Sequence, residues 1–323
     1  MGAAPKMMTE MPERLSDVPY QVKKVPVREA FQALSNGCRK FRNTGATFKL
    51  SFRSRKNPKQ SCFIPFSAIK DSGVYPRISG ELRYAEQLPD NFCDSRLIWD
   101  HGRWFVHIPY REVPLPAETQ GRVVALDPGV RTFLTGYCET TAFKLGAGAM
   151  ARIARLTSHM DRLIGKMAKA PCRKRRSMKK ALNRMKWKVW NLIDELHFKS
   201  IRFLLDNFDL ILLPTFETSN MVVKKRRKIR SKTVRAMMTL AHFRFKQRLK
   251  AAAIAAGKRV QDVCEAYTSK TASWTGEIVR IGGAKVIRSN GVSMDRDYNG
   301  ARGIFLRALV DTPSLAIPSE CNG

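Results

Sequence analysis

Hydrophobic and polar positions follow one pattern up to about residue 115 and another from residue 121 onwards. In the first part, apolar and polar residues alternate over short runs, which is typical of strands with one face in water. The elements expected there are a short amphipathic helix within 20–35 and strands at 47–53, 61–66, 74–84 and 97–110, the last with a turn at 100–102. Their basic outward-facing residues predict a small β-barrel that grips nucleic-acid backbones, although a barrel with an ordinary solvated surface would show the same alternation.

From residue 121, continuous apolar runs replace the alternation. The runs at 123–126 and 210–213 are typical of strands that are buried on both faces of a sheet. Pro171 marks the bend of a long helical hairpin. The other elements expected are strands at 132–137 and 258–264 and helices at 147–206 (the hairpin), 233–256 and from about Asp297 onwards. Strands and helices that alternate in this way predict an α/β domain.

The charge of the chain narrows the classes of protein to which it can belong. It carries 59 Lys and Arg against 27 Asp and Glu, a formal net charge of +32. This excess repels itself unless a polyanion is bound, and nucleic acid is the obvious one. Seven irregularly spaced Cys, without a C-x-x-C pair, predict reduced thiols in an intracellular protein. No uncharged apolar run reaches about 18 residues, which argues against a membrane span.

Three acidic residues lie where ligands collect in an α/β layer, outside the carboxyl ends of strands. Asp127 ends one buried strand, Glu217 follows another, and Asp297 opens the last helix, where a carboxylate suits the positive helix end. Converging carboxylates repel one another unless cations compensate their charge. Two Mg²⁺ ions about 4 Å apart would do so, and would also activate water and stabilise the leaving oxygen of a phosphodiester. The pattern therefore indicates a metal-dependent nuclease.

Each of these acids also has a purely structural explanation. Asp127 precedes Pro-Gly and fits a turn, while Glu217 can cap a helix that follows it. Asp295 and Asp297 can likewise cap the last helix. His197 lies close to two acids and resembles a metal ligand, but their spacing cannot place all three side chains on one helical face. A packed or hydrogen-bonded His197 is expected instead.

Basic residues gather in two runs, at 173–188 and 224–235. With this net charge, contacts with backbone phosphates are favoured over merely solvated faces, because Lys and Arg release counterions from nucleic acid. Tyr267 fits either base stacking or the edge of a core. The run 224–228 also fits a nuclear-import signal. The residues expected to contact nucleic acid are Arg173, Lys174, Arg175, Arg176, Lys224, Lys225, Arg226, Arg227, Tyr267 and Lys270.

Four short motifs occur in a fixed order along the chain. They are LDPGVRTF at 126–133, LPTFETSNM at 213–221, YTSKT at 267–271 and DRDYNGAR at 295–302. Together they resemble the TnpB proteins encoded by bacterial insertion sequences, and their eukaryotic and viral relatives, the Fanzor proteins. The sequences PTFETS and GARGIFLR favour the Fanzor branch. The resemblance covers about residues 20–310.

This resemblance implies an RNase H-like RuvC domain with a helical-hairpin insertion, preceded by a small wedge-like β-barrel. It assigns the barrel to 1–120, the two parts of the RuvC-like domain to 121–266 and 291–323, and a target-nucleic-acid-binding insert to 267–290. The implied activity is RNA-guided DNA cleavage, as in type V CRISPR effectors, with a guide RNA (omega RNA) and target DNA as partners. The barrel would hold the guide RNA and the start of the heteroduplex.

The resemblance also assigns roles within the site. One RuvC-type site would cut both DNA strands in turn. Two Mg²⁺ ions, replaceable by Mn²⁺, are the implied cofactors. The implied catalytic metal ligands are Asp127, Glu217 and Asp297, and the residues in support are Asp295, Asn299 and Arg302.

The chain departs from the family pattern in two places. Relatives usually carry a four-Cys zinc ribbon in the insert, but the expected positions here hold Ala272, Trp274 and Thr275. Residues 271–294 contain neither Cys nor His, and zinc needs about four N, S or O ligands, so no zinc is expected. The apolar residues of the insert are sufficient for a hairpin. The N-terminal part is also short for a full recognition lobe.

Three other functions share parts of this pattern. A guided or plain DNA-binding protein that has lost catalysis would keep the charge, but the presence of all three acids argues against it. A transposase would join strands rather than only cut them. A ribosomal-type or histone-like structural protein would need no grouped carboxylates. The expected location is intracellular: the nucleus of a eukaryotic host, otherwise the cytoplasm or nucleoid.

Overall fold

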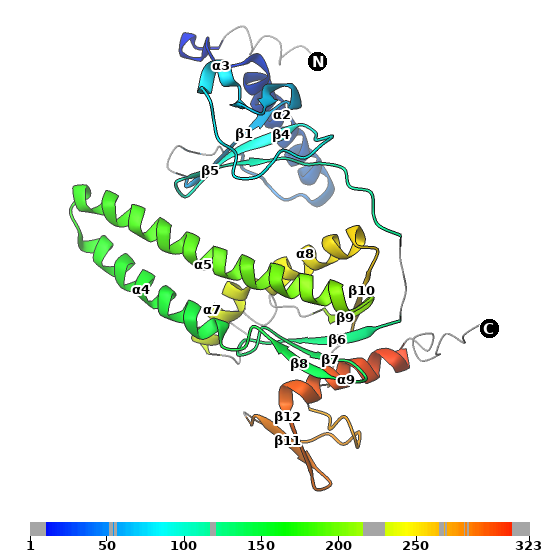
Figure 1. The fold of residues 1–323 in the computed structure, drawn as a ribbon. Coiled ribbons are helices and arrows are strands. Elements are labelled where there is room, and N and C mark those ends of the chain that lie inside the picture. Colours follow the sequence, from blue (N-terminus) through cyan, green and yellow to red (C-terminus); the bar gives the residue numbers. More distant parts are fainter. Residues whose placement is uncertain are drawn as a thin grey trace. The chain divides into compact units, whose positions relative to one another are not determined.

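The computed structural model describes residues 11–51, 54, 57–116, 121–215, 230–264, 268, 270–280, 282 and 284–311. The chain separates into two compact units, Met1–Glu112 and Val113–Gly323 (Figure 1). None of the described helices has both the length and the apolar composition needed to cross a membrane. The six cysteines within the described ranges are free thiols.

An open antiparallel sheet forms the centre of the first unit. In the order in which they pair, its strands are β1 (Lys59–Ile64), β4 (Ser95–Asp100) and β5 (Arg103–His107). His101 and Gly102 form the expected turn between β4 and β5, and their positive φ angles of 45° and 96° suit the twist of a two-residue hairpin. The other elements are η1 (Glu13–Leu15), α2 (Tyr20–Thr44), η2 (Phe66–Ala68), β2 (Ile69–Lys70), β3 (Gly73–Val74) and α3 (Pro76–Ser79).

The first unit confirms some expectations and corrects others. The strands expected at 61–66 and 97–110 are present as β1, β4 and β5. The strand expected at 47–53 is wrong over its described part, because Phe48 packs its ring against Gly37 of α2 instead of pairing with a strand. The strand expected at 74–84 is wrong as well, since α3 begins at a proline, which cannot donate to a ladder. Within the described residues the sheet has three strands and does not close into the expected barrel.

A five-stranded mixed sheet forms the centre of the second unit. In spatial order, its strands are β10 (Arg259–Val263), β9 (Leu210–Pro214), β6 (Val123–Pro128), β7 (Leu134–Tyr137) and β8 (Ala142–Leu145). Strands β6, β9 and β10 are parallel, whereas β6, β7 and β8 form an antiparallel meander. The four strands expected in this region are confirmed, and β8 is an addition to them.

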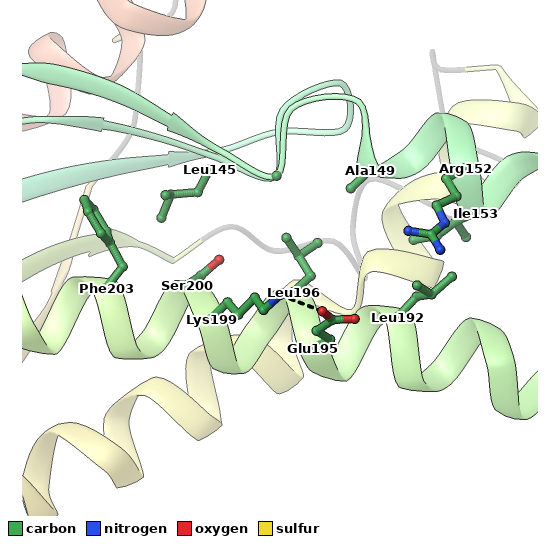
Figure 2. Close-up of a pocket in the computed structure, with 11 residues that line it drawn as sticks. Leu145, Ala149, Arg152, Ile153, Leu192, Glu195, Leu196, Lys199, Ser200 and Phe203 are labelled. Carbon is green, nitrogen blue, oxygen red and sulfur yellow. Dashed lines mark hydrogen bonds and ion pairs between the residues drawn. The ribbon is translucent and has the colours of Figure 1, made fainter.

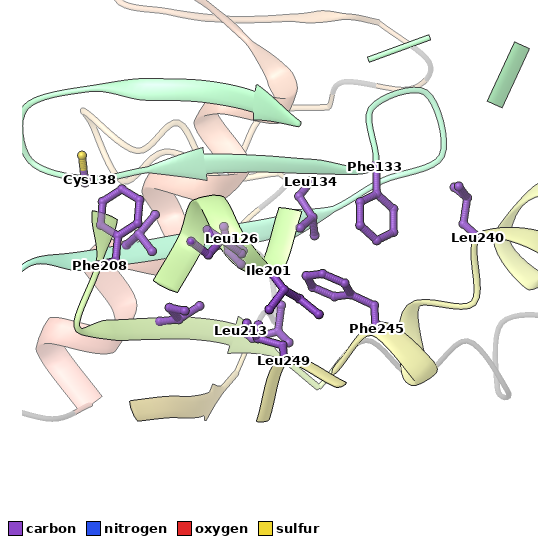
Figure 3. Packing of buried hydrophobic residues seen from close by; sticks show 13 residues of the cluster. Leu126, Phe133, Leu134, Cys138, Ile201, Phe208, Leu213, Leu240, Phe245 and Leu249 are labelled. Carbon is purple, nitrogen blue, oxygen red and sulfur yellow. The ribbon is translucent and has the colours of Figure 1, made fainter. Parts of the chain in front are cut away.

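Helices cover both faces of this sheet, which explains its continuous apolar runs. These helices are α4 (Ala149–Lys169), α5 (Cys172–Asn207), α7 (Ser231–Leu240), α8 (His242–Ala255) and α9 (Arg296–Asp311). On one face, Leu126 and Leu213 pack with Ile201 of α5 and Phe245 of α8 (Figure 3). On the other face, Ala125 of β6 lies in a second cluster with residues of α9. Neighbouring residues of β6 therefore face opposite layers, and the second unit is an α/β domain.

Helices α4 and α5 form the expected hairpin. Pro171 is the residue before α5, where its fixed φ and missing N–H do not disturb the helix. At 36 residues, α5 is roughly 54 Å long. The turn between the two helices projects beyond the sheet, as Figure 1 shows.

The long helix expected after this hairpin is two helices, α7 and α8, which is a correction. Ala241 separates them in a left-handed conformation with φ 51°. His197 Nε2 donates to the carbonyl of Leu240 at 2.8 Å, and His242 Nε2 donates to the carbonyl of Gly129 at 3.1 Å. Two hydrogen bonds from tertiary structure thus fix the chain on either side of the break, and local helix preference cannot reveal them.

A hairpin of β11 (Val286–Ser289) and β12 (Val292–Asp295) leads directly into α9. Ile287 is buried, and the Trp274 indole Nε1 donates to the carbonyl of Ser289 at 3.2 Å. Only β11 lies within the insert expected at 267–290, whereas its partner β12 lies beyond it, so this hairpin connects the insert to the start of the last helix and differs from the one expected inside the insert.

Candidate active site

Asp127 lies one residue before the end of β6, at the carboxyl edge of the parallel strands. Its Oδ2 atom is directed at α9, because a Cβ placed on Gly300 would be only 2.5 Å from that oxygen. Real Cβ atoms essentially never lie closer than 3.0 Å to another heavy atom, so a residue without Cβ is required here. The end of β6 and the beginning of α9 are therefore in direct contact.

Asp297 lies in the first turn of α9, three residues before Gly300. Residues three apart lie on the same side of a helix, with about 5–6 Å between their Cβ atoms. Asp297 is thus on the side of α9 that contacts Asp127.

Asp295 caps α9, as the structural explanation of this acid predicted. Its Oδ1 accepts the backbone N–H groups of Asp297 at 2.9 Å and Tyr298 at 3.4 Å. Its Oδ2 accepts a hydrogen bond from Lys144 Nζ at 2.8 Å. Burial raises the pKa of Asp295. The hydrogen bonds from Lys144 and from the Asp297 amide lower it by more, so the net pKa lies below its usual value. Asp295 is therefore ionised at neutral pH and stabilises the turn that carries Asp297.

Asn299 and Arg302 attach the insert to α9. The fully buried Asn299 accepts the Ser273 amide at 2.9 Å through Oδ1. Its Nδ2 donates to the carbonyls of Thr271 at 2.8 Å and Thr268 at 3.4 Å. Arg302 Nη1 donates to Ser273 Oγ at 2.9 Å. Both residues thus hold the beginning of the insert against the helix.

Glu217, the third expected acid, lies outside the described residues, as do Tyr267 and the basic run 224–227. Strand β9 ends at Pro214, and it runs parallel to β6 as its direct neighbour. The described chain therefore leaves β9 at the same edge of the sheet that carries Asp127. This is the edge at which ligands collect in α/β sheets.

Carboxylate oxygens are the ligands that Mg²⁺ prefers in proteins. Within the described residues, no three His, Cys, Asp or Glu side chains are grouped closely enough to hold a metal ion. The predicted ligands Asp127, Asp297 and Glu217 are all carboxylates, and the first two belong to elements that approach each other at Gly300. The chemistry of this set fits a hard cation such as Mg²⁺.

The basic residues at the start of α5 are exposed at the far end of the helical hairpin. Residues 162–188 contain twelve Lys or Arg and no Asp or Glu. Arg175 also has a structural contact, because its Nε donates to the carbonyl of Ala170 at 2.7 Å and so caps the end of α4. Lys270 is exposed on the insert. The other residues of the exposed set are Arg173, Lys174 and Arg176.

His197 is packed in the core and hydrogen-bonded, as expected. Its ring stacks on Phe133 with centroids 5.2 Å apart, and His242 stacks on Phe133 at 5.0 Å. Burial lowers the pKa of each histidine to about 4, against the opposing effect of a backbone carbonyl that each one contacts. Both rings are therefore neutral at neutral pH. His242 was missed by the sequence reasoning, since no motif distinguishes it.

A pocket of about 380 Å³ lies between α5, the start of α4 and the end of β8 (Figure 2). Apolar side chains such as Leu196 and Phe203 form most of its wall. Its charged residues include Glu195 and Lys199, which pair with each other at 2.7 Å. None of the expected site residues lines this pocket, and its donor groups do not suit metal-dependent chemistry.

Comparison with known proteins gives one matching family model and several viral relatives. Residues 242–304 match the family model described as Cas12f1-like, TNB domain. A putative transposase of Paramecium bursaria Chlorella virus 1 is 28% identical over 279 residues, 81% of this chain and 63% of the relative. A putative transposase of Acanthamoeba polyphaga mimivirus is 28% identical over 253 residues, 74% of this chain and 51% of the relative. A TnpB-like protein of the same virus is 24% identical over 213 residues, which are 64% of this chain and 41% of the relative.

This chain therefore spans between 41% and 63% of the length of these relatives. Among solved structures, a Cas12f1–sgRNA–target DNA complex matches with a TM-score of 0.48 and 12% identity, over 73% of this chain and 48% of that chain. A CRISPR–Cas12f ternary complex matches with a TM-score of 0.40 and 13% identity, over 94% of this chain and 75% of that chain.

The fold and the site define a class of basic α/β proteins with carboxylates at the carboxyl edge of a mixed sheet. The family model, which covers residues 242–304, and the viral relatives, at up to 28% identity, support a relation to a known family. The chain is related to the TnpB and type V effector proteins, and the resemblance read from its motifs is confirmed.

Proposed function

We propose that this protein is an RNA-guided, Mg²⁺-dependent DNA endonuclease of a mobile element, with a single RuvC-type site. The observation that carries the proposal is the close approach of Asp127 to Gly300 of α9, three residues after Asp297 on the same side of the helix. The order of the strands supports an RNase H-like domain, because a three-stranded meander is joined by two strands parallel to its first strand. The relation to TnpB proteins supports the same reaction class.

The protein's own contribution to this chemistry is to place carboxylates before a metal binds. Asp127, Asp297 and Glu217 would hold the ions, and bound Mg²⁺ supplies activation of water and stabilisation of the leaving oxygen. The sheet fixes Asp127, and the cap formed by Asp295 fixes the turn of Asp297. Gly300 allows the two elements to approach. Because neighbouring carboxylates repel one another, this arrangement favours cation binding.

The helical hairpin is proposed to bind phosphate backbones. Helix α5 begins with a basic run and has no acid in its first turn. Positive charge at the positive end of a helix dipole destabilises an isolated helix, so this arrangement does not serve helix stability. The same N-terminal charge favours a phosphate ligand. A guide RNA would select the target by base pairing, while the protein holds the heteroduplex by shape and charge.

The insert is proposed to contact target nucleic acid without a zinc ion. Ala272 is fully buried, at one of the positions where relatives carry a zinc ligand. Thr275 Oγ1 and Ser289 Oγ are hydrogen-bonded at 3.1 Å, and Ser289 Oγ donates to Glu277 Oε2 at 2.7 Å. These bonds connect the two ends of the insert. Elemental analysis of the purified protein should therefore find no stoichiometric zinc.

The proposal is tested with the full chain purified together with its co-expressed RNA. Addition of Mg²⁺ should give cleavage of DNA that matches the guide and none of mismatched DNA. Asp127→Asn should abolish cleavage while RNA still copurifies. Asp311→Asn is the matched control, because Asp311 lies at the other end of α9 in an exposed pair with Arg307. Undiminished cleavage by Asp127→Asn would refute the proposal.

A second candidate function shares the basic charge and the relation to viral transposases. A guided binding protein with little or no turnover, or a transposase accessory protein, would retain the charge and the RNA. Tight binding of matched DNA without cleavage in either Mg²⁺ or Mn²⁺ would favour this alternative over the nuclease.

A further inference from the structure

Lys144 of β8 lies beside the first turn of α9, although none of the motifs includes it. Its Nζ is 2.8 Å from Asp295 Oδ2 and 4.5 Å from the centroid of the Tyr298 ring. The side chain of Lys144 is 27% exposed and that of Asp295 is 39% exposed, so the ion pair is partly shielded from water. Strand β8 thus places one cation against the turn that carries Asp297.

The two oxygens of Asp295 have separate partners. Oδ2 accepts from Lys144, while Oδ1 accepts the amides of Asp297 and Tyr298. A carboxylate held at one oxygen cannot rotate freely, so the pair with Lys144 fixes the orientation in which Oδ1 caps the helix. The hydrogen bond with Asp295 also raises the pKa of Lys144, which keeps the pair ionised at neutral pH.

We propose that Lys144 is a positioning residue of the metal site: it holds Asp295 in its capping orientation and thereby fixes Asp297 opposite Asp127. This inference rests on the proposed function. Charge alone predicts the opposite effect, because a lysine close to metal-binding carboxylates opposes the binding of a cation. Removal of Lys144 should therefore tighten metal binding if only its charge matters, and weaken it if its positioning role matters.

Electron paramagnetic resonance measures the binding of Mn²⁺ alone to the full-length protein. It shows directly whether removal of Lys144 weakens or tightens metal binding. Lys144→Met should weaken Mn²⁺ binding by roughly tenfold or more, as loss of a residue that orients a metal ligand does. Lys144→Arg should retain most of the affinity. Lys250→Met is the matched control, because Lys250 forms a 2.9 Å pair with Asp262 on another part of the same unit. Equal or tighter binding by Lys144→Met would overturn the inference.

Amide hydrogen exchange without metal separates this inference from the proposed function. Lys144→Met should speed exchange at the amides of Asp297 and Tyr298 by roughly tenfold, the effect of weakening an N-cap, while later turns of α9 keep their protection. Unchanged exchange at these two amides would overturn the positioning role, whether or not a metal binds. Faster exchange in a protein whose wild type binds no Mn²⁺ would instead contradict the proposed function.

Discussion

Gly300 determines how closely β6 and α9 can approach, and so it determines the site. Any Cβ at this position would meet the Asp127 carboxylate at 2.5 Å. The carboxylate lies at the end of a buried strand, where the backbone of Asp127 is paired with Thr135 of β7. The helix or the carboxylate would have to move, and either movement changes the place where the acids meet.

Gly300→Ala is expected to lower the free energy of unfolding by about 1–3 kcal/mol, the usual effect of over-packing, and to slow cleavage. Urea denaturation measures the change in stability. Gly165→Ala in the exposed part of α4 is the control, because its Cβ would meet nothing within 4 Å. That control should raise the free energy of unfolding by about 0.5–1 kcal/mol. A Gly300→Ala protein as stable as the wild type and fully active would contradict the argument that the approach of Gly300 to Asp127 sets the site.

The buried histidines predict how stability depends on pH. Their pKa of about 4 in the folded state lies below the ordinary 6.5, so the unfolded chain takes up protons first as the pH falls. Stability is therefore fully retained above pH 6.5 and is lost as the pH falls from 6.5 towards 4. His197→Gln should remove its part of this loss, about 1–3 kcal/mol. Urea denaturation between pH 6.5 and 4 measures this loss of stability. His107 is exposed, and His107→Gln is the control variant.

Some site residues could be predicted from the sequence and others could not. Asp127 ends a buried strand, and Asp297 opens a helix. Those positions alone indicate the carboxyl edge of a sheet. Lys144 could not be selected among 59 basic residues, because its significance depends on the position of β8 beside α9. The sequence allows Asp295 to be either a supporting residue or a cap, and its hydrogen bonds to the amides of Asp297 and Tyr298 show the cap.

At the scale of elements, burial on both faces made the central strands predictable, since β6 and β9 are continuous apolar runs. Strand β8 lies at an edge and is only half-buried, so its sequence lacks that pattern. The separation of α7 from α8 depends on tertiary hydrogen bonds at Leu240 and Gly129, which local periodicity does not contain. The strand predicted from the alternation at 47–53 is wrong over its described part for a related reason, because Phe48 packs on a helix.

The three parallel strands begin around one buried carboxylate, that of Asp209, which is 5% exposed. Its Oδ1 pairs with Lys258 Nζ at 2.5 Å just before β10, and its Oδ2 accepts the Arg122 amide at 3.1 Å just before β6. Asp209 itself precedes β9. The residue thus ties together the amino ends of the strands whose other ends carry the site.

Asp209→Ala is expected to lower the free energy of unfolding by about 3 kcal/mol, because it leaves the partly buried Lys258 without this partner. Asp206→Ala provides the control, since its pair with Arg202 is exposed and should contribute less than about 0.5 kcal/mol. Thermal or urea unfolding distinguishes the two. Equal effects of both substitutions would remove the argument that Asp209 organises the sheet.

At the scale of the whole molecule, the charge is concentrated where the fold exposes it. The hairpin segment 162–188 carries twelve basic residues without one acid, and it projects beyond the sheet in Figure 1. A segment of this kind repels itself, and polyanion binding relieves that repulsion. Several described acids of the second unit lie instead in ion pairs, such as that of Asp194 with Arg248.

Neutralising Arg173, Lys174 and Arg176 together by Gln should weaken binding of single-stranded RNA and lower its dependence on salt. The slope of log binding constant against log salt should become smaller by about 2–3, from three lost phosphate contacts. Arg175 is left intact because it caps α4. Lys199→Gln with Arg202→Gln, on the same helix near its other end, should change the slope far less. An unchanged slope in the triple variant would exclude the hairpin as a phosphate-binding surface.

The central claim is that Asp127 and Asp297 act as one site. The most direct measurement is single-turnover cleavage of guide-matched DNA in Mg²⁺ by the full chain with its RNA, comparing Asp127→Asn, Asp297→Asn and the double variant. Residues that act as a unit are strongly non-additive, so each single substitution should reduce the rate as far as the double one does. Full activity of either single variant, or losses that simply multiply in the double variant, would contradict the account.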